Sequence, residues 1–304
     1  METINKITTS KQTTMYDHLC KMIIGNEEVL SRIIKAAVDE ANHLNVEEIR
    51  RLIKGVHIGD LIVNPHFHLA DKKGFIKDEG MVYYDILCYI DVPQEDGKNI
   101  RVYLNVEIQN NPYPGYSIIT RGYAYVSRIV SEQWGSEYDD KNYDGMKKVY
   151  SLWIMPKAPK RKDGYMNVYE TNERIICGTT VEEKEIYDKG VILAIYLNKE
   201  HDELLTPLMV LLNNVLDYKG KQRIIEEYGL NTKKIESEVK DMCDLGESIA
   251  LEARNEGKQI ERKEKNIAHV KKLMIGLQMS FKEAINLLEI PEKEVKEIEK
   301  YFQS

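Results

Sequence analysis

The chain has no long hydrophobic run and few cysteines, and both absences narrow the class of protein. Its longest apolar stretches, such as Val191–Leu197 and Leu208–Leu212, are far shorter than the ~20 residues that a membrane-spanning helix needs. The polar segment Met1–Thr14 lacks the apolar core of a secretory signal. The four cysteines lie far apart without a CxxC pair, which favours reduced thiols over a structural zinc site. We therefore expect a cytoplasmic protein with no membrane partner.

Basic residues are also fewer than acidic ones. The chain has 43 Lys and Arg against 50 Asp and Glu, a net charge of −7, which argues against nucleic acid because phosphate binding relies on Lys and Arg. The distribution is uneven, however, since residues 147–162 carry six basic side chains and no acidic one. Such a stretch fits either a confined DNA track or a solvated loop. Its members are Lys147, Lys148, Lys157, Lys160, Arg161 and Lys162.

The order of predicted elements indicates an α/β core. Residues 56–77 lack sustained periodicity, so we predict a loop with short extended pieces there. Helical spacing of apolar residues predicts helices at Ile23–Asn42, Val46–Gly55, Tyr116–Gln133, Leu204–Asp217 and Lys221–Glu227. Runs rich in β-branched and aromatic residues predict strands at Met81–Val92, Ile100–Gln109, Val149–Met155 and Val191–Asn198.

The composition changes beyond about Lys234, so we predict one domain over residues 1–235 and a helical extension over 236–304. Glu247–Lys265 mixes acidic and basic residues, as an exposed helical linker does. Leu273–Val295 has the rhythm of a small helix-turn-helix. Its second helix carries more Glu than Lys, so an interaction or self-association module is the better interpretation.

The two strands at Met81–Val92 and Ile100–Gln109 form a predicted hairpin, because the turn pair Asp96-Gly97 lies between them. A turn centred near Asp96 sets Asp85 opposite either Val106 or Glu107. Directly paired residues have Cβ atoms roughly 5 Å apart. Two carboxylates at that separation repel unless a proton or a cation lies between them.

A hard divalent cation such as Mg²⁺, or Mn²⁺, suits this pair of carboxylates. In phosphodiester hydrolysis it would activate a water molecule and offset negative charge on the phosphate. Gln109, two residues beyond Glu107 on the same strand face, could hydrogen-bond that water, and the backbone carbonyl of Ile108 could add a ligand. The plainer alternative is that Asp85 and Glu107 are solvent-facing positions of an ordinary hairpin.

These residues resemble the core of the PD-(D/E)XK nuclease superfamily, and more narrowly the Rpn family of recombination-promoting nucleases and related transposases. The resemblance runs from about Gly80 to Pro156. It is carried by Asp85 in YYDI, Glu107-Ile108-Gln109 in NVEIQ, Pro114-Gly115-Tyr116, Thr120-Arg121, Ser127-Arg128 and the strand KVYSLWI after Lys147.

The resemblance implies a mixed central sheet flanked by helices and a metal-dependent DNA endonuclease acting in recombination, transposition or defence against foreign DNA. Asp85 and Glu107 become metal ligands, with Glu40 as a further candidate from the first helix, and Gln109 stands where the superfamily usually has Lys. On the following helix, the predicted phosphate contacts at i, i+4 and i+7 are Arg121, Tyr125 and Arg128.

Gln109 leaves a different class of function open. Because glutamine cannot carry the positive charge of lysine, the fold could be a catalytically silent module that binds DNA or protein, or a purely structural protein. If the enzyme cuts both strands with one centre per chain, a homodimer is favoured.

Overall fold

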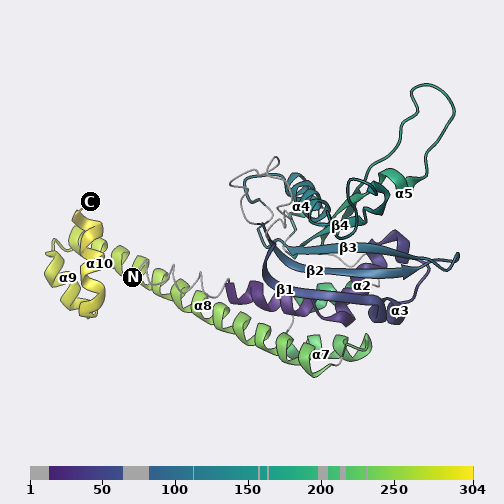
Figure 1. The fold of residues 1–304 in the computed structure, drawn as a ribbon. Helices are drawn as coiled ribbons and strands as arrows, with labels where there is room; N and C mark the ends of the chain where they lie inside the picture. The colour runs from purple at the N-terminus through teal and green to yellow at the C-terminus, as the bar shows by residue number, and fades with distance from the viewer. Residues whose placement is uncertain are drawn as a thin grey trace. The chain divides into compact units, whose positions relative to one another are not determined.

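A computed structural model of the chain describes residues 14–63, 82–111, 113–156, 158–162, 164–197, 205–212, 217–230 and 232–303 (Figure 1). The chain divides into two compact units, Met1–Cys243 and Asp244–Ser304. The predicted α/β class is confirmed, since the first unit holds a six-stranded mixed sheet with helices packed on it. No helix in these ranges is both long enough and apolar enough to cross a bilayer.

The sheet has the strand order β1-β2-β3-β4-β6-β5. Strands β1 (Ile53–Val63), β2 (Val82–Pro93) and β3 (Asn99–Ile108) are antiparallel neighbours and lie side by side in Figure 1. Strands β4 (Lys148–Met155) and β6 (Gly190–Tyr196) continue the sheet parallel to β3. Parallel neighbours need a crossover connection, and helix α4 (Ile118–Glu132) supplies it between β3 and β4. The short β5 (Met166–Tyr169) pairs antiparallel with β6.

The remaining helices of the first unit begin with an unlabelled helix over residues 14–24. They continue with α2 (Glu27–Ala37), η1 (Asp39–Ala41), α3 (Val46–Leu52), η2 (Tyr143–Gly145), η3 (Lys160–Lys162), α5 (Lys184–Tyr187), α6 (Thr206–Leu212) and α7 (Tyr218–Glu227). Helix α8 (Lys233–Gly276) starts in this unit and continues into the second.

Helix α4 covers one face of the sheet centre. Its side chains Tyr125, Val126 and Ile129 form one apolar cluster with Trp153 and Ile192 of β4 and β6. On the opposite face, Tyr150 donates a hydrogen bond to Glu40 of the segment that follows α2. Both faces are therefore covered, which explains why β4 and β6 read as continuous apolar runs in the sequence.

The second unit packs the end of α8 against α9 (Phe281–Leu287) and α10 (Glu292–Gln303). Ser280 and Glu283 form a capping box that starts α9. The predicted short helices after Gly276 are confirmed. The core of this unit is small and consists of Val270, Ala284, Ile285, Ile290 and Ile298.

Two sequence predictions of structure were wrong, and one short strand was missed. The helix predicted over Ile23–Asn42 is interrupted, because Asn26 caps the new helix α2. The loop predicted over residues 56–77 is β1 as far as Val63, and residues 64–77 lie outside the described part. Two register shifts in β1 disturb the two-residue alternation that identifies a strand. The four-residue β5 was missed because three of its side chains are exposed.

Gly122 allows α4 to approach the sheet closely. A Cβ atom at this position would lie 2.9 Å from Ile192 Cγ2 and 3.0 Å from Trp153 Nε1. Alanine is normally the better helix former by about 1 kcal/mol. Here that gain is outweighed, because overpacking a filled core costs about 1–3 kcal/mol.

Gly122→Ala should therefore lower the thermal melting temperature by several degrees. Gly257→Ala is the matched control, since beyond its chain neighbours and its own helix backbone no described atom lies within 4 Å of its Cβ position, and it should not destabilise the chain. Calorimetry of both variants checks the prediction, and a neutral or stabilising Gly122→Ala would show that α4 can move away from the sheet at little cost.

Candidate carboxylate site

Asp85 and Glu107 meet where the hydrogen-bond ladder between β2 and β3 ends. The backbone pairing joins Leu87 with Asn105 and ends at Ile86 and Val106, and the same register continued by one residue sets Asp85 opposite Glu107, one of the two predicted alternatives. Beyond that point side chains replace the ladder. The Asp85 amide donates to Glu107 Oε1 (3.1 Å), and the Ile108 amide donates to Asp85 Oδ2 (2.9 Å). Each carboxylate is thus held by the backbone of the neighbouring strand.

The pair lies in a desolvated environment. Glu107 is only 3% exposed, and burial raises its pKa well above the ordinary value, with the nearby Asp85 carboxylate raising it further. Burial also raises the pKa of Asp85, against the Ile108 amide and Lys21, which lower it. The alternative of a solvent-facing hairpin is wrong for Glu107, because α4 covers this face of the sheet.

Lys21 is part of the site, and the sequence analysis missed it. Its Nζ lies 2.8 Å from Asp85 Oδ1 and 3.4 Å from Asp17 Oδ2 on the same helix. Asp17 also accepts a hydrogen bond from Asn110 Nδ2 (3.0 Å), just beyond β3. The helix of residues 14–24 therefore brings a cation and a third carboxylate to the hairpin. The only sequence signal was the i, i+4 spacing of Asp17 and Lys21, which is common on helices.

Arg121 supplies a second cation from α4. Its guanidinium stacks 5.1 Å from the Trp153 ring centroid and donates to the Tyr125 hydroxyl (2.5 Å). Its charge also lowers the pKa of Glu107, opposing the effect of burial. Arg121 thus stacks on Trp153, which pairs with Glu107 in the sheet, and also contacts the loop that precedes α4.

The predicted DNA-contacting face of α4 is wrong in one of its three members. Tyr125 is 6% exposed and packs edge-on against Tyr84 and Trp153, so it cannot meet a phosphate backbone. Arg128 is partly exposed near the other end of the helix. Its charge lowers the pKa of Glu132, while burial raises that pKa to about 7. The charges of Arg121 and Arg128 therefore act on two different carboxylates, Glu107 and Glu132.

Gln109 follows Glu107 but its side chain bonds elsewhere. Its Nε2 donates to the Asn111 carbonyl (2.6 Å), and its amide donates to the Ile154 carbonyl (2.8 Å). Within the described residues its side chain makes no hydrogen bond to Asp85 or Glu107. At Ile108 it is the amide that contacts Asp85, while the role predicted for its carbonyl stays a prediction.

Glu40 does not belong to this site, so the prediction of Glu40 as a metal ligand is wrong. It contacts Lys148 Nζ (3.0 Å) and the Tyr150 hydroxyl (2.7 Å). Lys148 pairs with Val102 in the parallel register, which places it about 16 Å along the sheet from Glu107. Lys148 also forms an ion pair with Asp188 (2.7 Å) and is 14% exposed, so it is not a free phosphate contact either.

Strand β4 divides the basic stretch into two groups. Lys147 and Lys148 lie where β4 begins, and both line a cavity of about 500 Å³ with Glu40. Lys160, Arg161 and Lys162 follow the other end, about 23 Å away along the strand. That end is the one where Ile154 pairs with Ile108 beside the carboxylates. Lys160 and Arg161 are exposed, whereas Lys162 donates to the Tyr196 hydroxyl (2.8 Å).

The donor set at Asp85 and Glu107 fits a cation that retains most of its water ligands. In the ranges that the structure describes, no three His, Cys, Asp or Glu side chains form a metal-binding group. The second oxygen of Glu107, Oε2, accepts no hydrogen bond from any described residue. Mg²⁺ commonly binds through one or two carboxylates together with water and substrate phosphate, which is the arrangement that two acidic side chains can provide.

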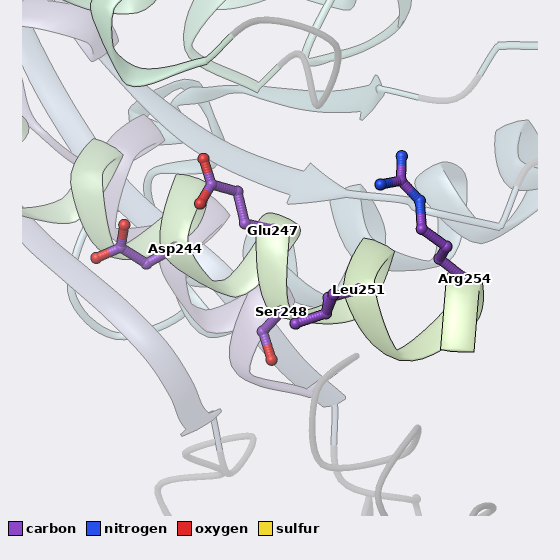
Figure 2. A pocket seen from close by; sticks show the side chains of 5 residues that line it. All are labelled: Asp244, Glu247, Ser248, Leu251 and Arg254. Atoms are coloured by element: carbon purple, nitrogen blue, oxygen red, sulfur yellow. The ribbon is translucent and has the colours of Figure 1, made fainter. Parts of the chain in front are cut away.

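A second cavity, of about 560 Å³, lies along α8 in the second unit and contains none of the predicted site residues. Figure 2 shows that its side chains come from successive turns of one helix. Two are acidic and one is basic, and Leu251 is exposed, so this surface has no evident chemistry. The residues are Asp244, Glu247, Ser248, Leu251 and Arg254.

Glu107→Gln should stabilise the protein near neutral pH in metal-free buffer. When folding raises the pKa of a carboxyl, the free energy of unfolding of the protein falls as the pH rises from the unfolded pKa through the folded pKa. The substitution removes that cost, about 1–3 kcal/mol, and retains the acceptor for the Asp85 amide. Denaturant unfolding at several pH values should show the advantage shrinking as the pH falls towards about 4.5. A variant less stable than the wild type at neutral pH would contradict this view of the site.

No protein-family model, no curated protein and no solved structure matches this chain.

Proposed function

We propose that this protein is a metal-dependent DNA endonuclease of the PD-(D/E)XK type, with Asp85 and Glu107 as metal ligands. The observation that carries the proposal is that buried Glu107 and partly buried Asp85 each accept a hydrogen bond from the backbone of the other's strand at the end of the β2–β3 ladder. Two like charges in a desolvated site are costly without a cation. The antiparallel hairpin followed by a helical crossover into a parallel strand also supports the resemblance to this superfamily and to its Rpn family.

A divalent cation at these carboxylates would lower the pKa of a bound water and offset charge on the scissile phosphate. The residues of the chain would position the metal ligands and bind the phosphate. Asp85 and Glu107 are already positioned by backbone amides, so their placement costs nothing at the moment of reaction. Arg121 is half-buried and can donate to a phosphate oxygen from a site where water screens charge poorly.

The charge of Lys21 can replace the positive charge that Gln109 lacks. The superfamily usually places a lysine two residues beyond the second carboxylate, and Gln109 cannot supply that charge. The ammonium of Lys21 reaches the same carboxylate pair from a different element, 2.8 Å from Asp85. We infer that Lys21 positions Asp85 and supplies the positive charge that position 109 lacks.

Nicking of supercoiled plasmid in Mg²⁺ or Mn²⁺ tests the two carboxylates. Asp85→Asn and Glu107→Gln should each reduce the rate by about 100-fold or more, as the loss of a transition-state-stabilising group does. Asp91→Asn is the matched control, because Asp91 lies on the same strand but pairs with Arg101 and Lys54. Mn²⁺ should raise the melting temperature of the wild type and not of the two site variants. Nicking that survives both site substitutions would refute the assignment.

Lys21→Gln should slow cleavage by roughly 10- to 100-fold, because the charge beside Asp85 is lost, and Lys21→Arg should restore part of the rate. Lys54→Gln is the control, since Lys54 forms an ion pair (3.0 Å) with Asp91, which lies on the same strand as Asp85. The measurement is the nicking rate at saturating Mn²⁺, with melting temperatures alongside. Equal effects of the Lys21 and Lys54 substitutions would assign Lys21 a structural role only.

The second candidate is a catalytically silent nuclease fold that binds DNA or protein. It is favoured by one observation: Lys21 already neutralises Asp85, while the Gln109 side chain bonds the Asn111 carbonyl rather than the carboxylates. Such a module would bind DNA without cutting it, and Asp85→Asn would leave binding unchanged. A purely structural protein would neither bind nor cut.

A further inference from the structure

The loop between β3 and α4, which begins two residues beyond Glu107, presents two tyrosine rings to solvent. In the sequence YPGYS, Tyr113 is 64% exposed and Tyr116 is 53% exposed. Tyrosine usually buries most of its ring and keeps only its hydroxyl in contact with water. Two exposed rings in one short loop therefore leave considerable apolar area uncovered.

The backbone that carries these rings is held in place. The Tyr113 amide donates to Asn111 Oδ1 (2.9 Å), and Ser117 caps α4 by accepting from the Thr120 amide (3.3 Å). Between the rings, Gly115 has φ +92°, a conformation that side-chain-bearing residues rarely adopt. Hydrogen bonds thus hold the chain at Tyr113 and at Ser117, on either side of the two rings, which lowers the cost of ordering this segment when a ligand stacks on it.

Arg121 connects the loop to the site. Its Nη1 donates to the Tyr116 hydroxyl (2.8 Å), and its guanidinium lies 5.8 Å from the Tyr116 ring centroid and 5.1 Å from that of Trp153. The same charge acts on Glu107. Trp153 pairs with Glu107 in the sheet register, so an exposed aromatic ring, a cation and the position of Glu107 adjoin one another.

This order of groups matches an unpaired nucleotide strand better than a duplex. Bases of a single strand can stack on aromatic side chains while a neighbouring cation binds the phosphate. A duplex keeps its bases stacked on each other and offers mainly phosphates and groove edges. Duplex binding would need a broad basic surface. At the carboxylate end of β4 the described residues offer two exposed cations, Lys160 and Arg161, while Lys162 bonds Tyr196 and Lys148 is paired with Asp188.

We propose that Tyr113 and Tyr116 stack unpaired bases of single-stranded DNA whose phosphate is bound by Arg121. The inference rests on the proposed endonuclease function and specifies its substrate as a strand that is unpaired at the point of cleavage. Supercoiled plasmid, which contains locally unpaired segments, is then a suitable substrate for nicking.

The test is fluorescence anisotropy with a labelled oligonucleotide of about 15 nucleotides, single-stranded or annealed to its complement. Both are measured with the full-length protein in EDTA, so that no cleavage occurs. The wild type should bind the single strand at least about tenfold more tightly than the duplex. Tyr113→Leu and Tyr116→Leu should each weaken single-strand binding by roughly tenfold, the usual effect of losing one stacking ring.

Two further variants separate stacking from other roles. Tyr116→Phe keeps the ring and loses the hydroxyl that Arg121 contacts, so it should retain most of the affinity. Tyr143→Leu is the matched control, because Tyr143 is 59% exposed but lies in η2, before the opposite end of β4, and its loss should have no effect.

Equal affinity for the two DNA forms, no binding of either, or a Tyr143→Leu effect equal to that of Tyr116→Leu would overturn the inference. Binding and cutting are measured separately, so the two proposals can fail separately. Single-strand binding without nicking would refute the endonuclease alone, and Asp85-dependent nicking without single-strand preference would refute the stacking role alone.

Discussion

The structure of the candidate site depends on two hydrogen bonds between side chains and backbone. The Asp85 amide bonds Glu107, and the Ile108 amide bonds Asp85, at the point where β2 and β3 stop pairing through their backbones. These bonds satisfy two amides that the ended ladder would leave without partners. They also fix two like charges side by side, so the surrounding structure must provide compensating cations.

The compensation comes from elements on either side of the hairpin in the sequence. Lys21 comes from the helix of residues 14–24, and Arg121 comes from α4, whose close approach depends on Gly122. Helix α4 both buries Glu107 and delivers the guanidinium that opposes the cost of that burial. A site built in this way lowers the stability of the fold, and under the proposed function that cost would be offset by reactivity at the carboxylates.

Elsewhere in the described residues, several cations are held by carboxylates. At the start of β4, Lys148 is held between Glu40 and Asp188, and at the hairpin's turn end Arg101 bonds both Asp91 and Glu137. Basic residues that are close in the sequence are thereby separated or neutralised in the fold. Net charge and charge runs were therefore poor guides to which cations could meet a ligand.

The sequence by itself determined the local features: the hairpin and its register to within one residue, the helix that became α4, the buried strands and the proximity of Asp85 to Glu107. Each follows from turn chemistry or side-chain periodicity over a few residues. Only the tertiary structure decided that Lys21 joins the pair, that Glu40 and Lys148 do not, and that Tyr125 is buried. Those outcomes depend on which distant segments pack together, and a single sequence has no local signal for such contacts because packing is set by the whole core.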